Sequence, residues 1–134
     1  MREKVASILM IATGCGIATF WILFFTVGMA PRPAPPCYFA FEHSFVLPDF
    51  FLCAALIAGG VAVLKGMAGG RPLALAASGA LVFLGSLDFS FNVTNGVYAT
   101  SPVELVTNGF INLWCVIFGI ILFLIFRTPS NIKR

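Results

Sequence analysis

An apolar run, VELVTNGFINLWCVIFGIILFLIF, occupies residues 103–126 and is followed at once by Arg127 and then by Pro129. A transmembrane helix needs about 20 consecutive, mainly apolar residues, so this run is long enough to cross a bilayer. A cation at the end of an apolar run and a proline just beyond it are typical of a helix C-terminus. The run therefore predicts a membrane-spanning helix that ends near residue 126.

Three further apolar runs precede this one, and the four predicted spans cover residues 5–29, 48–65, 72–94 and 103–126. The chain has 60% hydrophobic and 10% charged residues, whereas charged residues make up about a quarter of a soluble domain. Within 134 residues, four spans leave no room for a separate soluble domain. The sequence thus predicts an all-α integral membrane four-helix bundle that forms a single domain over residues 1–134.

A long outer loop, residues 30–47, separates the first two spans. It begins with a proline-rich segment that favours extended polyproline geometry and ends the first helix. The first apolar run exceeds the about 7 to 15 residues of a signal-peptide core, so we expect a retained helix. The aromatic residues 37–47 are expected to lie in the membrane interface or to fold back over the bundle. Pro48 and Asp49 are expected to begin the second span.

The basic residues predict the orientation of the chain. With a cytoplasmic amino terminus, seven of the eight Lys and Arg residues fall on the cytoplasmic side and only Arg32 falls outside. Such an excess is typical of cytoplasmic loops, so both termini are predicted to be cytoplasmic. Of the five acids, only Glu3 then lies inside. The other four lie in the outer loop or at the outer ends of spans, and they are Glu42, Asp49, Asp88 and Glu104.

Two polar stripes run down from the outer side. In LDFSFNVTNGVY, residues 87–98, the side chains of Asp88, Asn92 and Asn95 share one helix face. The last span carries a matching stripe at the spacing i, i+4 and i+8, formed by Glu104, Asn108 and Asn112. A carboxylate within a membrane needs a partner, a cavity or a proton, because burial of its charge is costly. The two stripes are therefore predicted to face each other.

These acids and amides predict an outward-opening pocket between helices, with Glu42 or His43 folded over it. The predicted ligand-binding residues are Glu42, His43, Asp49, Asp88, Asn92, Glu104, Asn108 and Asn112. The alternative is a structural role, since Asn and Asp side chains also join transmembrane helices by hydrogen bonds worth roughly 0.6 to 2 kcal/mol. Trp21, Trp114 and the phenylalanines are interpreted as lipid-facing or packing bulk.

Other kinds of site have little support in the sequence. His43, Glu42 and Asp49 make a poor metal-ligand set without a second histidine or a suitable cysteine, so no metal or cofactor is expected. The four cysteines form no CxxC pair, and a disulfide between Cys37 and Cys53 stays open as an alternative. No recognisable catalytic motif is present, so no catalytic residue is assigned. The scattered basic residues form no nucleic-acid-binding stripe.

The predicted pocket is compatible with three classes of function. The first is binding of a small or lipid-like ligand, or of a protein partner, without enzymatic activity. The second is a proton- or cation-coupled transporter that acts as an oligomer, because four short helices rarely enclose a whole pathway. The third, with the least support, is an intramembrane lipid-modifying enzyme. The expected partners are the lipid bilayer and either further copies of the chain or another membrane protein.

Two stretches carry a family resemblance. FEHSFVLPD, residues 41–49, and LDFSFNVTNGVY, residues 87–98, resemble small bacterial four-helix membrane proteins without an assigned activity. The resemblance implies a four-span fold in the bacterial cytoplasmic (inner) membrane. The chain lacks the first-helix acid of small multidrug transporters and the CxxC of quinone-linked thiol oxidases. It is similar only in outline to emopamil-binding-like bundles, so no residue role is carried over.

Overall fold

The computed structural model describes residues 1–128, and every regular element in that range is helical. In chain order the elements are α1 (Arg2–Thr26), α2 (Tyr38–His43), α3 (Val46–Leu64), α4 (Gly70–Thr94), the 3₁₀ helix η1 (Val97–Ala99) and α5 (Pro102–Phe126). Four of them, α1, α3, α4 and α5, are long and apolar enough to cross a membrane. The structure thus confirms the predicted all-α fold with four long apolar helices.

Some helix starts differ from the predicted ones, and one helix is new. α3 begins at Val46, so that Pro48 lies within its first turn, where proline is tolerated. α4 begins at Gly70, two residues earlier than predicted. The predicted outer loop contains the short helix α2. α5 begins after Ser101, whose hydroxyl accepts a 3.1 Å hydrogen bond from the Glu104 backbone N–H and so caps the helix.

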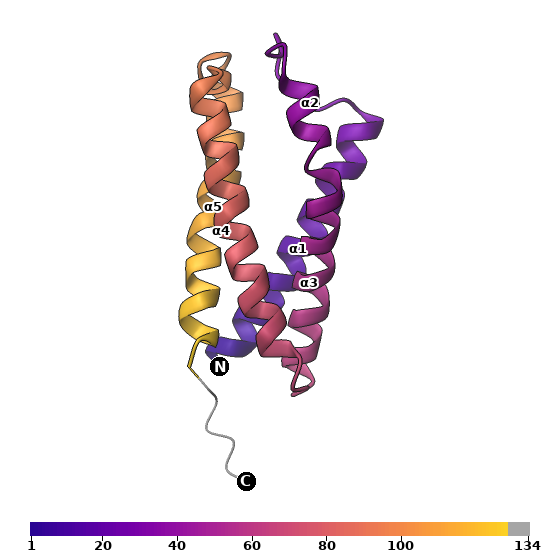
Figure 1. Cartoon of the computed structure of the whole chain (residues 1–134), viewed down its shortest axis with the longest axis vertical. Coiled ribbons are helices and arrows are strands. Elements are labelled where there is room, and N and C mark those ends of the chain that lie inside the picture. Colours follow the sequence, from indigo (N-terminus) through magenta and orange to yellow (C-terminus); the bar gives the residue numbers. More distant parts are fainter. Residues whose placement is uncertain (129–134) are drawn as a thin grey trace.

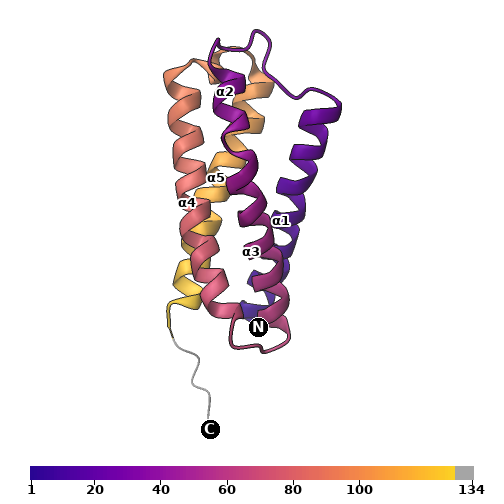
Figure 2. The ribbon, with the colours of Figure 1, turned by 45° about the vertical axis from the view of Figure 1, so that its right-hand side comes forward.

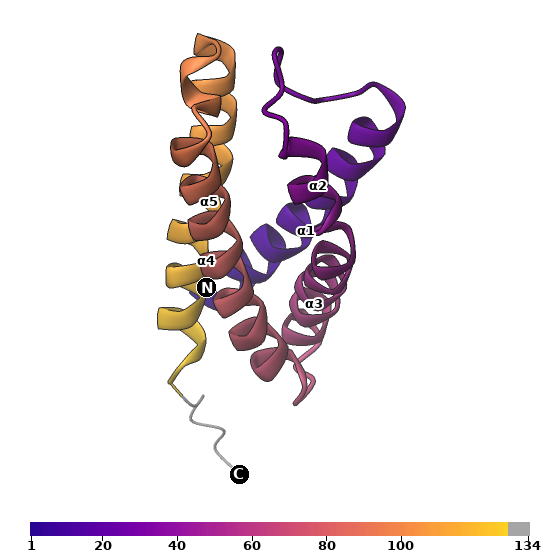
Figure 3. The ribbon, with the colours of Figure 1, turned by 45° about the horizontal axis from the view of Figure 1, so that its top comes forward.

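The long helices form two pairs that diverge like the arms of a V (Figure 1). α1 packs on α3 and α4 packs on α5, while contacts between α3 and α4 join the pairs. The pairs meet at the closed end, formed by the start of α1, the turn at residues 65–69 and the end of α5 (Figure 2). They diverge toward the open end, which carries the connections at residues 27–45 and 95–101 (Figure 3). A space for side chains from both pairs is therefore left near the open end.

Glycines allow the helices within each pair to approach closely. Gly60 of α3 faces α1, and a Cβ atom at this position would lie 2.7 Å from the Ser7 carbonyl oxygen. Gly85 of α4 faces α5, and a Cβ atom there would lie 2.8 Å from the Asn112 carbonyl oxygen. Neither site has room for a methyl group. Each pair is therefore packed backbone against backbone, as is common for small residues at helix interfaces.

The core and a charged contact fix the middle and the closed end of the bundle. The largest aliphatic side chains without exposed surface come from all four long helices, and they are Met10, Leu56, Leu81 and Leu122. At the start of α4, the Arg71 guanidinium pairs with Glu3 of α1. It also donates a 3.1 Å hydrogen bond to the Phe126 carbonyl at the end of α5. Arg71 thus ties three helices together where the two pairs meet.

Candidate functional site

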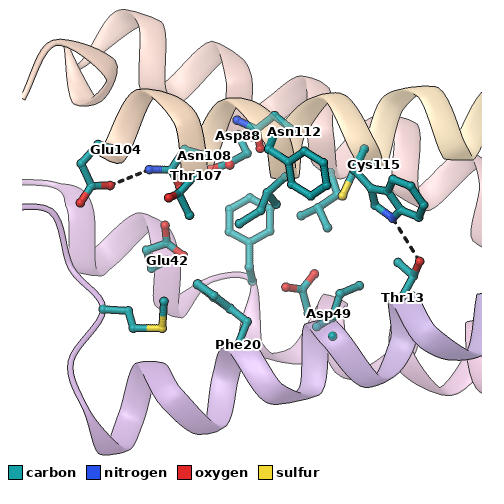
Figure 4. A pocket seen from close by; sticks show the side chains of 18 of the residues that line it. Thr13, Phe20, Glu42, Asp49, Asp88, Glu104, Thr107, Asn108, Asn112 and Cys115 are labelled. Atoms are coloured by element: carbon teal, nitrogen blue, oxygen red, sulfur yellow. Dashed lines mark hydrogen bonds between the residues drawn. The ribbon is translucent and has the colours of Figure 1, made fainter. Parts of the chain in front are cut away.

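A cavity of about 710 Å³ lies between the two helix pairs, toward the open end. Side chains from all four long helices and from α2 line it, and Figure 4 shows how they point into the shared space. Six of the eight predicted ligand-binding residues line this cavity, and they are Glu42, Asp49, Asp88, Glu104, Asn108 and Asn112. The predicted convergence of acids and amides is therefore present, while binding of a ligand by them stays a prediction.

The α5 stripe forms one wall of the cavity. The Asn108 amide donates a 2.7 Å hydrogen bond to Glu104 Oε2, one helical turn away. One turn further along, the Asn112 amide donates a 2.7 Å hydrogen bond to the Tyr98 hydroxyl, which comes from η1. Asn112 is buried, with 2% of its surface exposed. The amides thus orient a carboxylate and the η1 turn, and the i, i+4 spacing of the stripe explains why all three of its residues reach the cavity.

Asp88 reaches the cavity from α4, and Asn92 supports it from behind. The Asn92 amide donates a 3.3 Å hydrogen bond to Asp88 Oδ2. Asn92 itself is 2% exposed and does not line the cavity, although the sequence predicted it as a ligand-binding residue. Its side chain contacts the Asp88 carboxylate and does not reach the lining of the cavity. Asn92 is therefore a positioning residue for the Asp88 carboxylate.

Asp49 is the most buried of the four cavity acids, with 6% of its surface exposed. The Trp21 indole of α1 donates a 3.0 Å hydrogen bond to Asp49 Oδ2. The sequence interpretation of Trp21 as lipid-facing or packing bulk missed this role. A lone tryptophan in an apolar run gives no signal of a polar contact, because the partner lies 28 residues away and depends on how α1 rotates against α3.

Glu42 reaches the cavity from α2. Burial, and after it the negative charges of Asp88 and Asp49, raise the pKa of Glu42 from about 4.5 to about 7, although a hydrogen bond with Tyr38 opposes the shift. Burial and the adjacent Glu42 also raise the pKa of the Tyr38 hydroxyl, so this group stays protonated near neutral pH. α2 is fixed over α4 by the stacked rings of Phe41 and Phe91, whose centroids lie 3.8 Å apart. Glu42 therefore closes part of the open end.

His43 points elsewhere. It is exposed and stacks on Phe25 of α1, with ring centroids 6.0 Å apart and planes within 7° of parallel. Of the two residues expected to fold over the pocket, Glu42 lines it and His43 does not. Adjacent residues of a helix point in directions about 100° apart, which separates the two side chains. Within residues 1–128, no group of three or more His, Cys, Asp or Glu side chains is placed to hold a metal ion.

The remaining lining of the cavity is mainly apolar. Ile17 and Phe20 face the cavity from α1, and Ile111 and Trp114 face it from α5. The Trp114 indole donates a 3.1 Å hydrogen bond to the Thr13 hydroxyl of α1, toward the closed end of the cavity. Among the described residues, no Lys or Arg lines the cavity. The site thus combines four carboxylates, two amides and an extensive apolar surface.

No protein-family model, curated protein or solved structure matches the chain. The chemistry of the cavity is therefore the basis on which a function is proposed.

The four cysteines are free thiols. The Cys37 thiol donates to Asn95 Oδ1 at 3.5 Å, at the open end. The Cys53 thiol donates to the Gly14 carbonyl at 3.3 Å, within the contact between α1 and α3. Cys37 and Cys53 thus contact different partners and form no bridge in this structure. Cys115 is buried and lines the cavity.

Proposed function

We propose that the four long helices span a membrane with both termini in the cytoplasm. The basic residues at the closed end are Arg2, Lys4, Lys65, Arg71 and Arg127, whereas Arg32 lies in a connection at the open end. This asymmetry is typical of proteins whose basic loops stay in the cytoplasm. The acidic cavity then opens toward the opposite side. The resemblance noted in the sequence suggests a bacterial cytoplasmic membrane.

Within that membrane, the protein binds a small amphiphile that carries a cationic head group. The observation that supports this most directly is that four carboxylates share one cavity without a Lys or Arg in its described lining. These residues are Glu42, Asp49, Asp88 and Glu104. Carboxylates shielded from water are costly unless a proton or a cation neutralises them. A cationic head group would supply that charge.

The apolar lining and its location suit the remainder of such a molecule. α1 and α5 make few contacts with each other, so the cavity between them is bordered by an incompletely closed seam. Ile17, Phe20 and Ile111 line the cavity beside this seam. An amphiphile dissolved in the bilayer would enter sideways between the helices, with its polar head toward the membrane surface. A cavity of this size, with a few polar groups in an apolar lining, is typical of small-molecule sites.

Binding of radiolabelled dodecyltrimethylammonium to the purified protein in uncharged maltoside micelles tests this proposal. We expect saturable binding that excess unlabelled compound displaces. Gly16→Phe should abolish binding, because Gly16 lines the cavity and a Cβ atom there meets no other atom within 4 Å. Gly79→Phe is the matched control, since its Cβ position is equally free but lies outside the cavity. Non-saturable uptake that is equal in both variants would overturn the proposal.

A second candidate function is cation transport coupled to protons, carried out by an oligomer. One observation favours it, namely the Glu42 pKa of about 7 beside further carboxylates. A cation that enters the cavity would displace the proton from Glu42, which links the two movements. Proteoliposomes with an imposed pH gradient should then accumulate radiolabelled tetramethylammonium or a longer homologue. Saturable binding without gradient-driven accumulation would leave the binding function and exclude this one.

A further inference from the structure

A second cavity, of about 360 Å³, lies between α1 and α5 nearer the closed end. Val5 and Leu9 line it from α1, and Ile117, Ile121 and Ile125 line it from α5. Apart from Arg2, every side chain in its lining is apolar. The cavity therefore offers hydrocarbon contact along the seam that α1 and α5 leave incompletely closed.

The two cavities adjoin along this seam. Leu9 and Trp114 line both of them, so these two side chains form the boundary where one cavity gives way to the other. Beside the boundary, the indole of Trp114 on α5 donates a hydrogen bond to the Thr13 hydroxyl on α1. The seam thus changes from carboxylates and amides near the open end to aliphatic and aromatic side chains, with Arg2 as the exception, near the closed end.

The second cavity is long enough along α5 to hold most of one hydrocarbon chain. Trp114 and Ile125 lie at its two ends along α5, and the helix rises about 16 Å between them at about 1.5 Å per residue. This is about half of a hydrocarbon core of about 30 Å, which is the depth of a single leaflet.

We propose that the ligand is a single-chain amphiphile whose head group lies against the carboxylates and whose chain runs past Trp114 along the α1–α5 seam into the second cavity. This inference rests on the proposed binding function and adds the chain to it. The order of the two cavities along the seam, polar and then apolar, matches the order of head and chain in such a molecule. A second copy of the protein packed on the seam would fill the apolar part but would not neutralise the four acids.

Two photoreactive analogues of dodecyltrimethylammonium test the head-group site and the path of the chain separately. One carries a diazirine next to the ammonium group and the other carries it at the chain end. Each is bound to the full protein in uncharged maltoside micelles and irradiated, and the labelled peptides are identified by mass spectrometry. We expect the head-proximal probe to label residues 103–112. We expect the chain-end probe to label residues 117–125 of α5 and 5–9 of α1, several-fold more than the exposed face around Phe50 of α3.

A matched pair of variants tests the path of the chain. Val5→Phe fills the second cavity and should reduce chain-end labelling of residues 117–125 several-fold, while labelling by the head-proximal probe is retained. Val93→Phe is the control, because Val93 is similarly exposed on α4 but lines neither cavity.

Three outcomes would overturn the inference. Head-proximal labelling in the first cavity combined with chain-end labelling spread evenly over exposed faces would remove the chain path and leave the binding function. Chain-end labelling of the seam that is lost when the protein self-associates at higher concentration would make a second copy the occupant. Absence of competable labelling by either probe would remove both the chain path and the binding function.

Discussion

The Trp21 indole lies 3.0 Å from Asp49 Oδ2 and ties the first long helix to the most buried acid of the cavity. The contact holds one carboxylate oxygen of Asp49 in place, and Asp49 lines the cavity. Trp21 itself does not line the cavity, so it acts through Asp49. The helix pair formed by α1 and α3 thus contributes a preoriented acid opposite Asp88 and Glu104.

Trp21→Phe is expected to lower the thermal stability of the protein. The substitution keeps an aromatic ring but removes the donor, and a buried acceptor left without its partner costs about 1–3 kcal/mol. Thermal unfolding in maltoside micelles measures the loss. Trp114→Phe is the comparison, because its indole bond to Thr13 is exposed and should contribute less. An equal loss in the two variants would contradict a specific role for the contact with Asp49.

Glu42→Gln is expected to change how stability depends on pH. The folded protein raises the pKa of Glu42 from about 4.5 to about 7, so the fold favours the protonated form. Stability of the wild type should therefore fall as pH rises from about 4.5 to about 7 and stay reduced above that range. Glutamine cannot ionise, so the variant lacks this part of the loss. Its melting temperature relative to the wild type should rise between about pH 4 and pH 8, and parallel profiles would contradict the prediction.

The helical period made much of the cavity predictable. Residues at i, i+4 and i+8 share a face, so the stripe of Glu104, Asn108 and Asn112 had to point in one direction. Asp88 joins it because the end of α4 and the start of α5 both lie at the open end of the bundle. The spacing could not reveal that Asn92 lies behind Asp88, since residues four apart share a face without sharing a depth.

The contacts between distant segments were not predictable. Trp21 meets Asp49 only because of the rotation of α1 against α3, which close packing at Gly60 helps to set. The six-residue helix α2 is too short to be stable alone, and stacking of Phe41 on Phe91 holds it in place. The cavities along the α1–α5 seam arise where two helices fail to pack closely. No periodic pattern within either helix predicts that these two helices fail to pack closely.

Gly85→Ala is expected to destabilise the protein, whereas Gly79→Ala should stabilise it. A Cβ atom at Gly85 would lie 2.8 Å from the Asn112 carbonyl oxygen, so α4 and α5 must move apart. Overpacking of this kind typically costs about 1–3 kcal/mol. At Gly79 nothing lies within 4 Å, and alanine gains up to about 1 kcal/mol of helix propensity. Melting temperatures measured in the same micelles should shift in opposite directions, and a shift in the same direction would contradict close packing at Gly85.

The proposed orientation predicts which loops an impermeant thiol reagent can reach in intact cells. Ala99 of η1 lies at the open end, and Met67 lies in the turn at the closed end between Lys65 and Arg71. Both side chains are exposed. In a Cys37→Ser background, which removes the exposed thiol at the open end, Ala99→Cys should react with an impermeant maleimide before lysis.

Met67→Cys should react in that background only after lysis, because basic flanks keep its turn in the cytoplasm. The Cys37→Ser protein without an added cysteine gives the baseline from the three remaining thiols. Reaction of Met67→Cys alone before lysis would reverse the orientation, and with it the side toward which the acidic cavity opens. Equal reaction of both variants in intact cells would contradict a chain that crosses the membrane.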